Sequence, residues 1–64
     1  MRLTYIDCYG IYYLKSKNIH NAIKEVKDFL QVKKVRRYRK FNNINVIDYV
    51  VIDNNFKFSI LYSE

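Results

Sequence analysis

Six of the twelve basic residues in this 64-residue chain lie within eight positions, Lys33 to Lys40, with the sequence KKVRRYRK. Val35 and Tyr38 are the other two residues of this segment. Arginine presents a planar fork of donors that suits phosphate oxygens, and an aromatic ring among basic side chains offers a surface for stacking a nucleobase. These residue types therefore indicate contact with a polyanion, and a nucleic-acid backbone is the simplest example.

The positive charge is concentrated in one region, because residues 15–34 and 35–41 each carry +4 whereas residues 42–64 carry −2. Such a field speeds encounter with anionic partners. We expect nucleic acid or another polyanion to be bound by Lys33, Lys34, Arg36, Arg37, Tyr38, Arg39 and Lys40. Charged residues also protect the edges of sheets from aggregation, although one or two lysines would be enough. The alternative of a protected edge without a ligand stays open.

The other polar residues do not form the pattern of a catalytic or metal site. His20 is the single histidine and Cys8 the single cysteine, which is too few for the usual zinc ligands. The six carboxylates are scattered, and one glycine cannot form a glycine-rich phosphate loop. Asp48 lies alone in an apolar run, so we expect it on an exposed sheet face or opposite an arginine of the neighbouring strand. We expect a protein that is not an enzyme and uses no cofactor or metal.

The length and composition predict one small folded domain, residues 1–64, which buries about 60% of its unfolded surface. Half of the residues are apolar and proline is absent, which argues against disorder. A single cysteine cannot form an internal disulfide, which favours a reducing compartment, and we expect Cys8 to be a small core residue. The apolar runs are too short for a membrane span or a signal peptide, so we expect a soluble cytoplasmic protein.

Residues 19–30, IHNAIKEVKDFL, have the apolar spacing of an amphipathic helix. Asn18 stands where the N-cap of this helix should be, and Ser16 is the competing cap. The face expected to be buried against a sheet consists of Ile23, Val26, Phe29 and Leu30, and the face expected in solvent includes His20, Lys24 and Lys27.

Three extended runs follow the helix, at residues 35–41, 44–53 and 56–63, and pairs of asparagines separate them. Asparagine tolerates the left-handed backbone of tight turns, so these runs predict two consecutive hairpins. The middle run is apolar on both faces and should be a central strand. The last run should bury Phe56, Phe58, Ile60 and Tyr62. As a strand, the basic run would have Val35, Arg37, Arg39 and Phe41 on one face and Arg36, Tyr38 and Lys40 on the other. Neither face is apolar enough to be buried, so this strand must lie at an edge of the sheet.

The segment before the helix, LTYIDCYGIYYL, is rich in residues that favour strands. Its DCYG sequence is either a turn between two strands or a bulge within one long strand, and both interpretations stay open. The expected fold class is therefore α+β, in the order β(β)αβββ, with one amphipathic helix packed on one face of a small antiparallel sheet. The other face of the sheet would be open, or covered by a partner.

The C-terminal stretch IDYVVIDNNFKFSILYS resembles the closing hairpin of many small α+β proteins, including toxins of the RelE and ParE type. The resemblance is one of shape. It implies a hairpin, and it assigns no active-site residue to any position of this chain.

Two functions from different classes fit these observations. The first is a small non-enzymatic basic domain that binds nucleic acid through the basic strand. The alternative is a small inhibitor or anti-defence protein, of the kind carried by phages and mobile elements, that binds an acidic or nucleic-acid-handling host protein. A small toxin-like ribonuclease is a weaker third hypothesis. The small core also favours a homodimer, through the N-terminal or C-terminal strand, and no membrane partner is expected.

Overall fold

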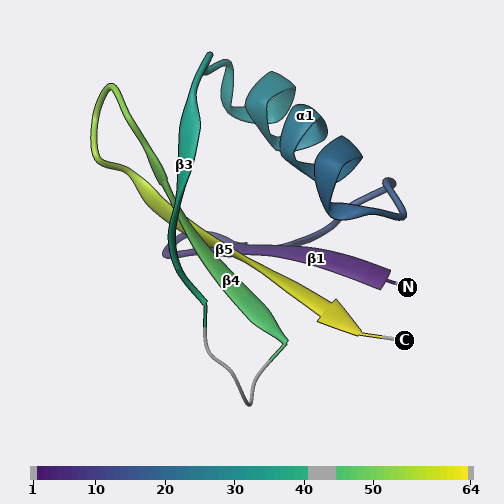
Figure 1. Cartoon of the computed structure of the whole chain (residues 1–64). Helices are drawn as coiled ribbons and strands as arrows, with labels where there is room; N and C mark the ends of the chain where they lie inside the picture. The colour runs from purple at the N-terminus through teal and green to yellow at the C-terminus, as the bar shows by residue number, and fades with distance from the viewer. Residues whose placement is uncertain (1, 41–44, 64) are drawn as a thin grey trace.

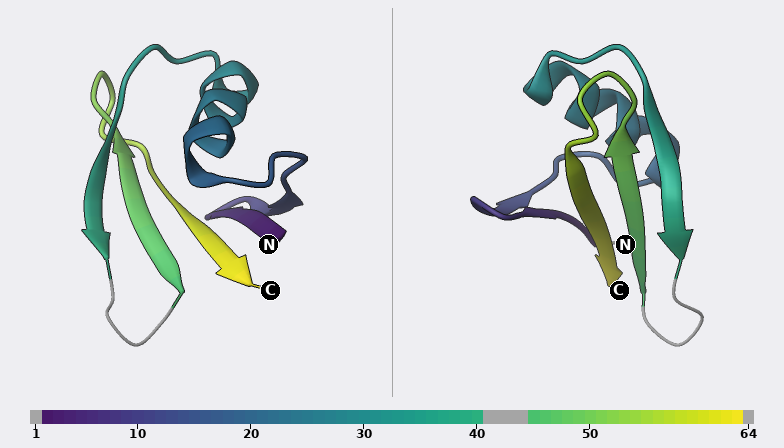
Figure 2. Two further views of the ribbon diagram at one scale, coloured as in Figure 1. Left: turned by 45° about the vertical axis from the view of Figure 1, so that its right-hand side comes forward. Right: turned by 90° about the vertical axis from the view of Figure 1, so that its left-hand side faces the viewer.

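The computed structural model describes residues 2–40 and 45–63. Its elements are β1 (Arg2–Asp7), β2 (Gly10–Tyr13), α1 (Ile19–Leu30), β3 (Val35–Lys40), β4 (Val46–Val51) and β5 (Lys57–Ser63). The strands form one antiparallel sheet in the order β2-β1-β5-β4-β3. Figures 1 and 2 show α1 lying across one face of this sheet. The α+β class is confirmed, and the alternative that the sequence left open is decided in favour of two strands before the helix.

The DCYG segment is the turn of a hairpin, since Asp7 pairs with Gly10 and leaves Cys8 and Tyr9 as the loop. Asp7 Oδ1 accepts hydrogen bonds from the backbone N–H groups of Tyr9 at 2.7 Å and Gly10 at 3.0 Å, which holds the reversal of the chain. The turn places Cys8 in solvent. The expectation that Cys8 belongs to the core is wrong, because a residue at the tip of a hairpin has no sheet to pack on.

The helix α1 has the bounds that its apolar spacing predicts. Asn18 Oδ1 accepts a hydrogen bond from the N–H of Asn21 at 2.9 Å, so Asn18 is the N-cap. Ser16 takes another role, because its hydroxyl donates to Glu25 Oε1 at 2.7 Å. The helix ends at Gln31, whose φ of 57° is left-handed. No helix in the described residues has the length and apolarity that crossing a bilayer requires.

The buried face of α1 is narrower than its spacing predicts. Val26 is fully buried together with Ala22, whereas Ile23 and Leu30 are half-buried and pack against the core. The prediction that Phe29 is buried is wrong, because 55% of this side chain is exposed.

Phe29 projects towards the outer strand β2 rather than over the middle of the sheet. Its ring centroid lies 5.2 Å from that of Tyr12 and 5.7 Å from that of Tyr5. The short strand β2 leaves one side of the Phe29 ring uncovered. On the solvent side of the helix, His20 and Lys24 are exposed as expected, whereas Lys27 is half-buried.

The core lies between α1 and the sheet face that α1 covers. The buried strand residues on this face are Leu3, Tyr5, Ile47, Tyr49, Val51, Phe58 and Ile60. The ring of Phe58 stacks between Tyr5 and Tyr49, with centroid distances of 5.3 and 5.4 Å. The prediction that the middle run is a central strand is confirmed, because β4 pairs with β3 and β5. Of the four residues expected to be buried in the last run, Phe58 and Ile60 are buried, whereas Phe56 and Tyr62 are half-buried and pack against the core.

The turn between β4 and β5 uses asparagine as the sequence predicts. Asn55 has a left-handed φ of 58°, and Asn54 Oδ1 accepts a hydrogen bond from the N–H of Phe56 at 2.9 Å. The other asparagine pair and Phe41 lie outside the described residues.

The outer strands of the sheet are β2 and β3. The edge position of the basic strand β3 is therefore confirmed. The N-terminal strand β1 pairs with β2 and β5, and the C-terminal strand β5 pairs with β1 and β4. Neither terminal strand offers an unpaired edge for a homodimer, because the two ends of the chain pair with each other, with Arg2 opposite Ser63.

Candidate nucleic-acid interface

The structure places the predicted basic residues along one edge of the sheet. Lys33 and Lys34 are exposed in the loop that joins α1 to β3, and Arg36, Arg37 and Tyr38 are exposed on β3 itself. The carbonyl of Lys34 accepts a hydrogen bond from the N–H of Ile52 at 3.2 Å, which fixes the loop against the end of β4. Arg39 and Lys40 end the strand, opposite Asp48 and Ile47.

The pairing of β3 with β4 does not follow simple alternation. The register shifts between Arg37 and Arg39, so that these two residues lie opposite Tyr49 and Asp48, which are consecutive in β4. The strict alternation along β3 that the sequence suggested therefore does not hold across Tyr38. A register shift of this kind adds a residue to one strand and increases its local twist.

Arg37 belongs to the helix-covered side of the sheet, because it lies opposite the core residue Tyr49. Tyr49 Oη is buried and makes no hydrogen bond among the described residues. Burial raises the pKa of the Tyr49 hydroxyl, and the positive charge of Arg37 partly offsets this rise. The hydroxyl is therefore neutral at physiological pH. The positive charge of Arg37 lies next to this hydroxyl and is also part of the basic strand β3.

The sheet face turned away from α1, here called the open face, carries two pairs of a cation and a tyrosine. Lys57 Nζ lies 4.7 Å from the ring centroid of Tyr38, and Arg2 Cζ lies 5.6 Å from that of Tyr13. In each pair the tyrosine comes from an outer strand and the cation from an inner strand. Sequence reasoning singled out Tyr38 but missed Lys57, Arg2 and Tyr13. Strand alternation could have found Arg2 and Tyr13 only after DCYG was known to be a turn.

A hollow of about 400 Å³ lies on the open face beside Tyr38 and Lys57. Its other lining residues are Ile6, Asp7, Cys8, Asp48, Phe58 and Ser59. Asp48 Oδ1 accepts a hydrogen bond from Ser59 Oγ at 2.6 Å, and Asp48 also lies opposite Arg39. Asp48 is thus where the sequence predicts it, in a strand and opposite an arginine of the neighbouring strand.

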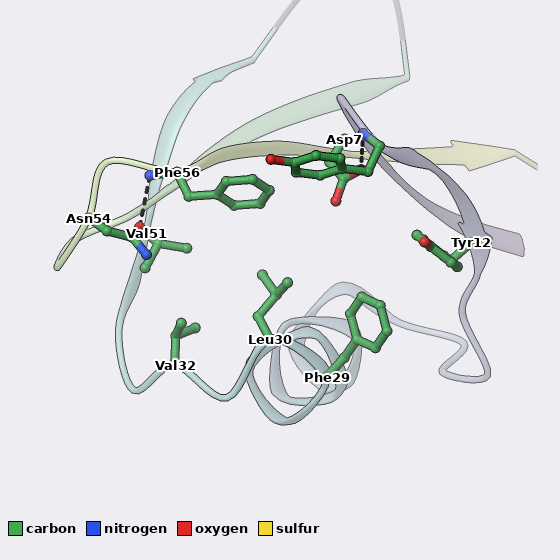
Figure 3. A pocket seen from close by; sticks show the side chains of 9 residues that line it. Asp7, Tyr12, Phe29, Leu30, Val32, Val51, Asn54 and Phe56 are labelled. Carbon is green, nitrogen blue, oxygen red and sulfur yellow. Dashed lines mark hydrogen bonds between the residues drawn. The ribbon is translucent and has the colours of Figure 1, made fainter.

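A second depression, the apolar cleft, lies on the helix side of the sheet and has a volume of about 440 Å³. Figure 3 shows its walls: the end of α1 with Phe29 and Leu30 on one side, and Phe56 near the β4–β5 turn on the other. The ring of Tyr9 stacks on Phe56, with a centroid distance of 6.4 Å. This lining suits apolar contact rather than recognition of an anion.

Asp7 supplies a carboxylate to the lining of the apolar cleft. Partial burial raises the pKa of Asp7, whereas hydrogen bonds from Tyr5 Oη and from the N–H groups of Tyr9 and Gly10 lower it. The hydrogen bonds have the larger combined effect, so the pKa of Asp7 is below its ordinary value. Burial, together with the hydrogen bond to Asp7, raises the pKa of Tyr5 well above its ordinary value. Asp7 is therefore an ionised structural acceptor near neutral pH, which is unsuited to general acid catalysis.

Glu25, in the middle of α1, has a similar structural role, because it holds the segment that precedes the helix. Its carboxylate accepts hydrogen bonds from the N–H groups of Lys15 and Ser16 and from Ser16 Oγ. Burial raises the pKa of Glu25, but these bonds lower it below its ordinary value overall. Among the described residues, no group of three or more His, Cys, Asp or Glu side chains could hold a metal ion.

Comparisons of the chain with protein-family models, curated proteins and solved structures find no match. A function must therefore come from the chemistry of the surface. The basic edge, formed by β3 with Lys33 and Lys34 before it, and the adjoining open face combine cations with exposed aromatic rings. The apolar cleft has no cation in its lining, and Asp7 is its one charged residue among those the structure describes.

Proposed function

We propose that this protein is a non-enzymatic domain that binds nucleic acid through β3 and the loop before it. The observation that supports this function best is the position of the basic segment at an outer edge of the sheet, where Lys33, Lys34 and Arg36 are exposed. An outer strand can approach a phosphate backbone without obstruction by a neighbouring strand. Several such contacts give binding that depends strongly on salt and little on sequence.

The geometry of the edge argues against protection from aggregation as the whole explanation. The register shift at Tyr38 disrupts the hydrogen-bonding pattern along β3, and such irregularities by themselves hinder pairing with another strand. Six basic residues are therefore more than protection of this edge requires. Lys33 and Lys34 precede the strand, so they cannot guard its hydrogen-bonding groups. Their charge is better explained by a ligand that extends beyond the strand.

The proposal is tested by measuring the fluorescence anisotropy of labelled DNA and RNA probes of arbitrary sequence at about 50 mM salt. The wild-type protein should bind all of them, with affinity that falls steeply as salt is added. If no probe is bound, the proposed function is wrong. Capture of one host protein by the wild type, but not by a variant lacking the basic side chains, would then support the alternative of an inhibitor that docks on a nucleic-acid-handling protein.

We also propose that two copies of the chain pair through β2. This outer strand, GIYY, is uncharged, and Ile11 and Tyr13 are exposed on it. The opposite edge is basic and would repel a second copy, so β2 is the edge suited to self-association. A monomer in sedimentation experiments at high protein concentration would contradict this.

An exposed unpaired Cys8 suits a reducing compartment, and we propose the cytoplasm.

A further inference from the structure

The open face carries an exposed tyrosine at each of its two borders. Tyr38, on β3, is 49% exposed, and Tyr13, on β2, is 73% exposed. Each side chain therefore leaves a large aromatic surface within reach of a ligand. Exposed rings on an antiparallel sheet are suited to stacking on unpaired bases.

The strand order sets the separation of the two tyrosines as measured across the strands. From β3 to β2 there are four inter-strand steps, which correspond to about 19 Å at about 4.8 Å each. This span suits a short run of nucleotides lying across the strands. A double helix keeps its bases paired and stacked inside, so it cannot offer base faces to both rings, whereas a single strand can.

The charges on the open face suit a nucleic-acid strand whose bases lie over the middle of the face. The middle of the face is formed by the half-buried side chains of Ile6, Ser59, Leu61 and Asp48, together with the buried Thr4 and Val50. All of these are neutral except the carboxylate of Asp48. Arg36 stands on the outer strand β3, and Arg2 of β1 lies beside Tyr13. Lys57 comes from the central strand β5, but its ammonium extends over β4 to the ring of Tyr38. A carboxylate repels phosphates, so the bases would occupy the middle and the phosphates the borders.

The contact between Lys57 and Tyr38 does not prevent stacking on that ring. A cation beside an exposed aromatic ring gains less than a base stacked on the same ring. A base can therefore displace the ammonium of Lys57 from the Tyr38 ring. The displaced ammonium would stay near the bound nucleotide and could contact its phosphate. The same reasoning applies to Arg2 beside Tyr13.

We infer that the ligand is single-stranded nucleic acid and that it crosses the open face from β3 to β2, with bases stacked on Tyr38 and Tyr13. This inference rests on the proposed function, and it names the form of nucleic acid and a surface beyond the basic edge. RNA and single-stranded DNA share the chemistry that this surface reads, namely base faces and phosphates.

The test compares a short oligothymidylate, an oligouridylate and a blunt duplex with the same number of phosphates. The variants Tyr13→Leu and Tyr38→Leu remove each ring, and each should weaken binding of the single strands by at least about fivefold while changing duplex binding little. Tyr9→Leu is the matched control, because Tyr9 is 81% exposed but stacks on Phe56 at the helix side. The two single-stranded probes show whether RNA or DNA is preferred.

A charge-matched pair tests the cations of the open face. Lys57→Met should weaken binding of the single strands more than Lys24→Met, which removes the same charge from the exposed side of α1. If either tyrosine variant fails to fold, photo-cross-linking of the wild type to iodouracil-substituted strands replaces it. Cross-links should then map to Tyr13 and Tyr38 and not to Tyr9.

The possible failures can be distinguished. Equal affinity for single strands and duplex, or tyrosine variants that behave like Tyr9→Leu, would overturn the inference and leave the proposed function standing. Cross-links that map to Tyr9 and not to Tyr13 or Tyr38 would also overturn it. Absence of binding to any probe would overturn both.

Discussion

The ammonium of Lys57 lies 4.7 Å from the centre of the Tyr38 ring, in a contact that crosses β4 and joins the inner strand β5 to the outer strand β3. This contact orients the ring at the point where the register of β3 shifts. It links the two parts of the proposed binding surface, because Tyr38 belongs to the basic edge and also borders the open face.

The first prediction concerns the stability that this contact provides. Lys57→Met keeps most of the aliphatic length and removes the charge, so the free energy of unfolding should fall by about 0.5–1 kcal/mol. Urea denaturation measures the change, and Lys24→Met is the control for loss of a surface charge. An equal effect of the two substitutions would show that the contact between Lys57 and Tyr38 does not stabilise the fold.

The second prediction concerns burial of apolar side chains. Leu3 is fully buried, so Leu3→Ala should lower the free energy of unfolding by about 2–5 kcal/mol, which is a large share of the stability of a small domain. Phe29 is half exposed, so Phe29→Ala should cost less than the roughly 3 kcal/mol typical of a buried phenylalanine. Thermal unfolding followed by circular dichroism measures both. A larger loss for Phe29→Ala than for Leu3→Ala would contradict this packing.

The third prediction concerns acid. The folded pKa of Asp7 is below its ordinary value of about 3.9, so its hydrogen bonds stabilise the fold above that pH, and the stabilisation is lost as the pH falls through the lowered pKa. Asp7→Asn keeps an acceptor for the turn but cannot ionise. The variant should therefore lose less stability than the wild type between about pH 4 and about pH 2.

Urea denaturation over this pH range makes the comparison. Asp53→Asn is the matched control, because it removes a carboxylate from the exposed turn after β4 without touching these hydrogen bonds. A stability curve for Asp7→Asn that runs parallel to the wild-type curve would show that the hydrogen bonds of Asp7 do not favour its ionised form.

The fourth prediction concerns the segment before the helix. Glu25→Ala removes the acceptor for the N–H groups of Lys15 and Ser16, so these two amides should exchange with solvent faster. The N–H of Ala22, which bonds to Asn18 within the first turn, provides the internal reference. Unchanged exchange at Lys15 and Ser16 in Glu25→Ala would mean that Glu25 does not hold this segment.

The features that were predictable from the sequence depend on chemistry within a few residues, or on the fact that charged side chains cannot be buried in the sheet. The helix could be placed because the Asn18 cap and the apolar spacing act over a few residues. The edge position of β3 followed from its charge, because so many cations cannot be buried between strands. The exposed pair Lys33 and Lys34 was found in the same way.

The features that were not predictable depend on register and on strand order. The exposure of Phe29 arises because β2 is short and lies at the outside of the sheet, which periodicity alone cannot reveal. The register shift at Tyr38 and the approach of Lys57 to its ring require the pairing of β3, β4 and β5 to be known. Arg2 and Tyr13 come together only through the β1–β2 hairpin.

The most direct test of nucleic-acid binding through the basic edge is the salt dependence of the affinity for a duplex probe. Lys33, Lys34 and Arg36 are the suitable residues, because all three are exposed and, unlike Arg37, none adjoins the buried Tyr49. Replacing them by alanine should flatten the slope of log K against log salt by roughly 2–3 units, since each phosphate contact on duplex DNA contributes about 0.9.

The control variant replaces Lys15, Lys17 and Lys24, which are exposed elsewhere and carry the same total charge. Its slope should stay close to that of the wild type. Equal slopes for the wild type and the Lys33, Lys34 and Arg36 variant, or equal flattening in both variants, would contradict binding through the basic edge.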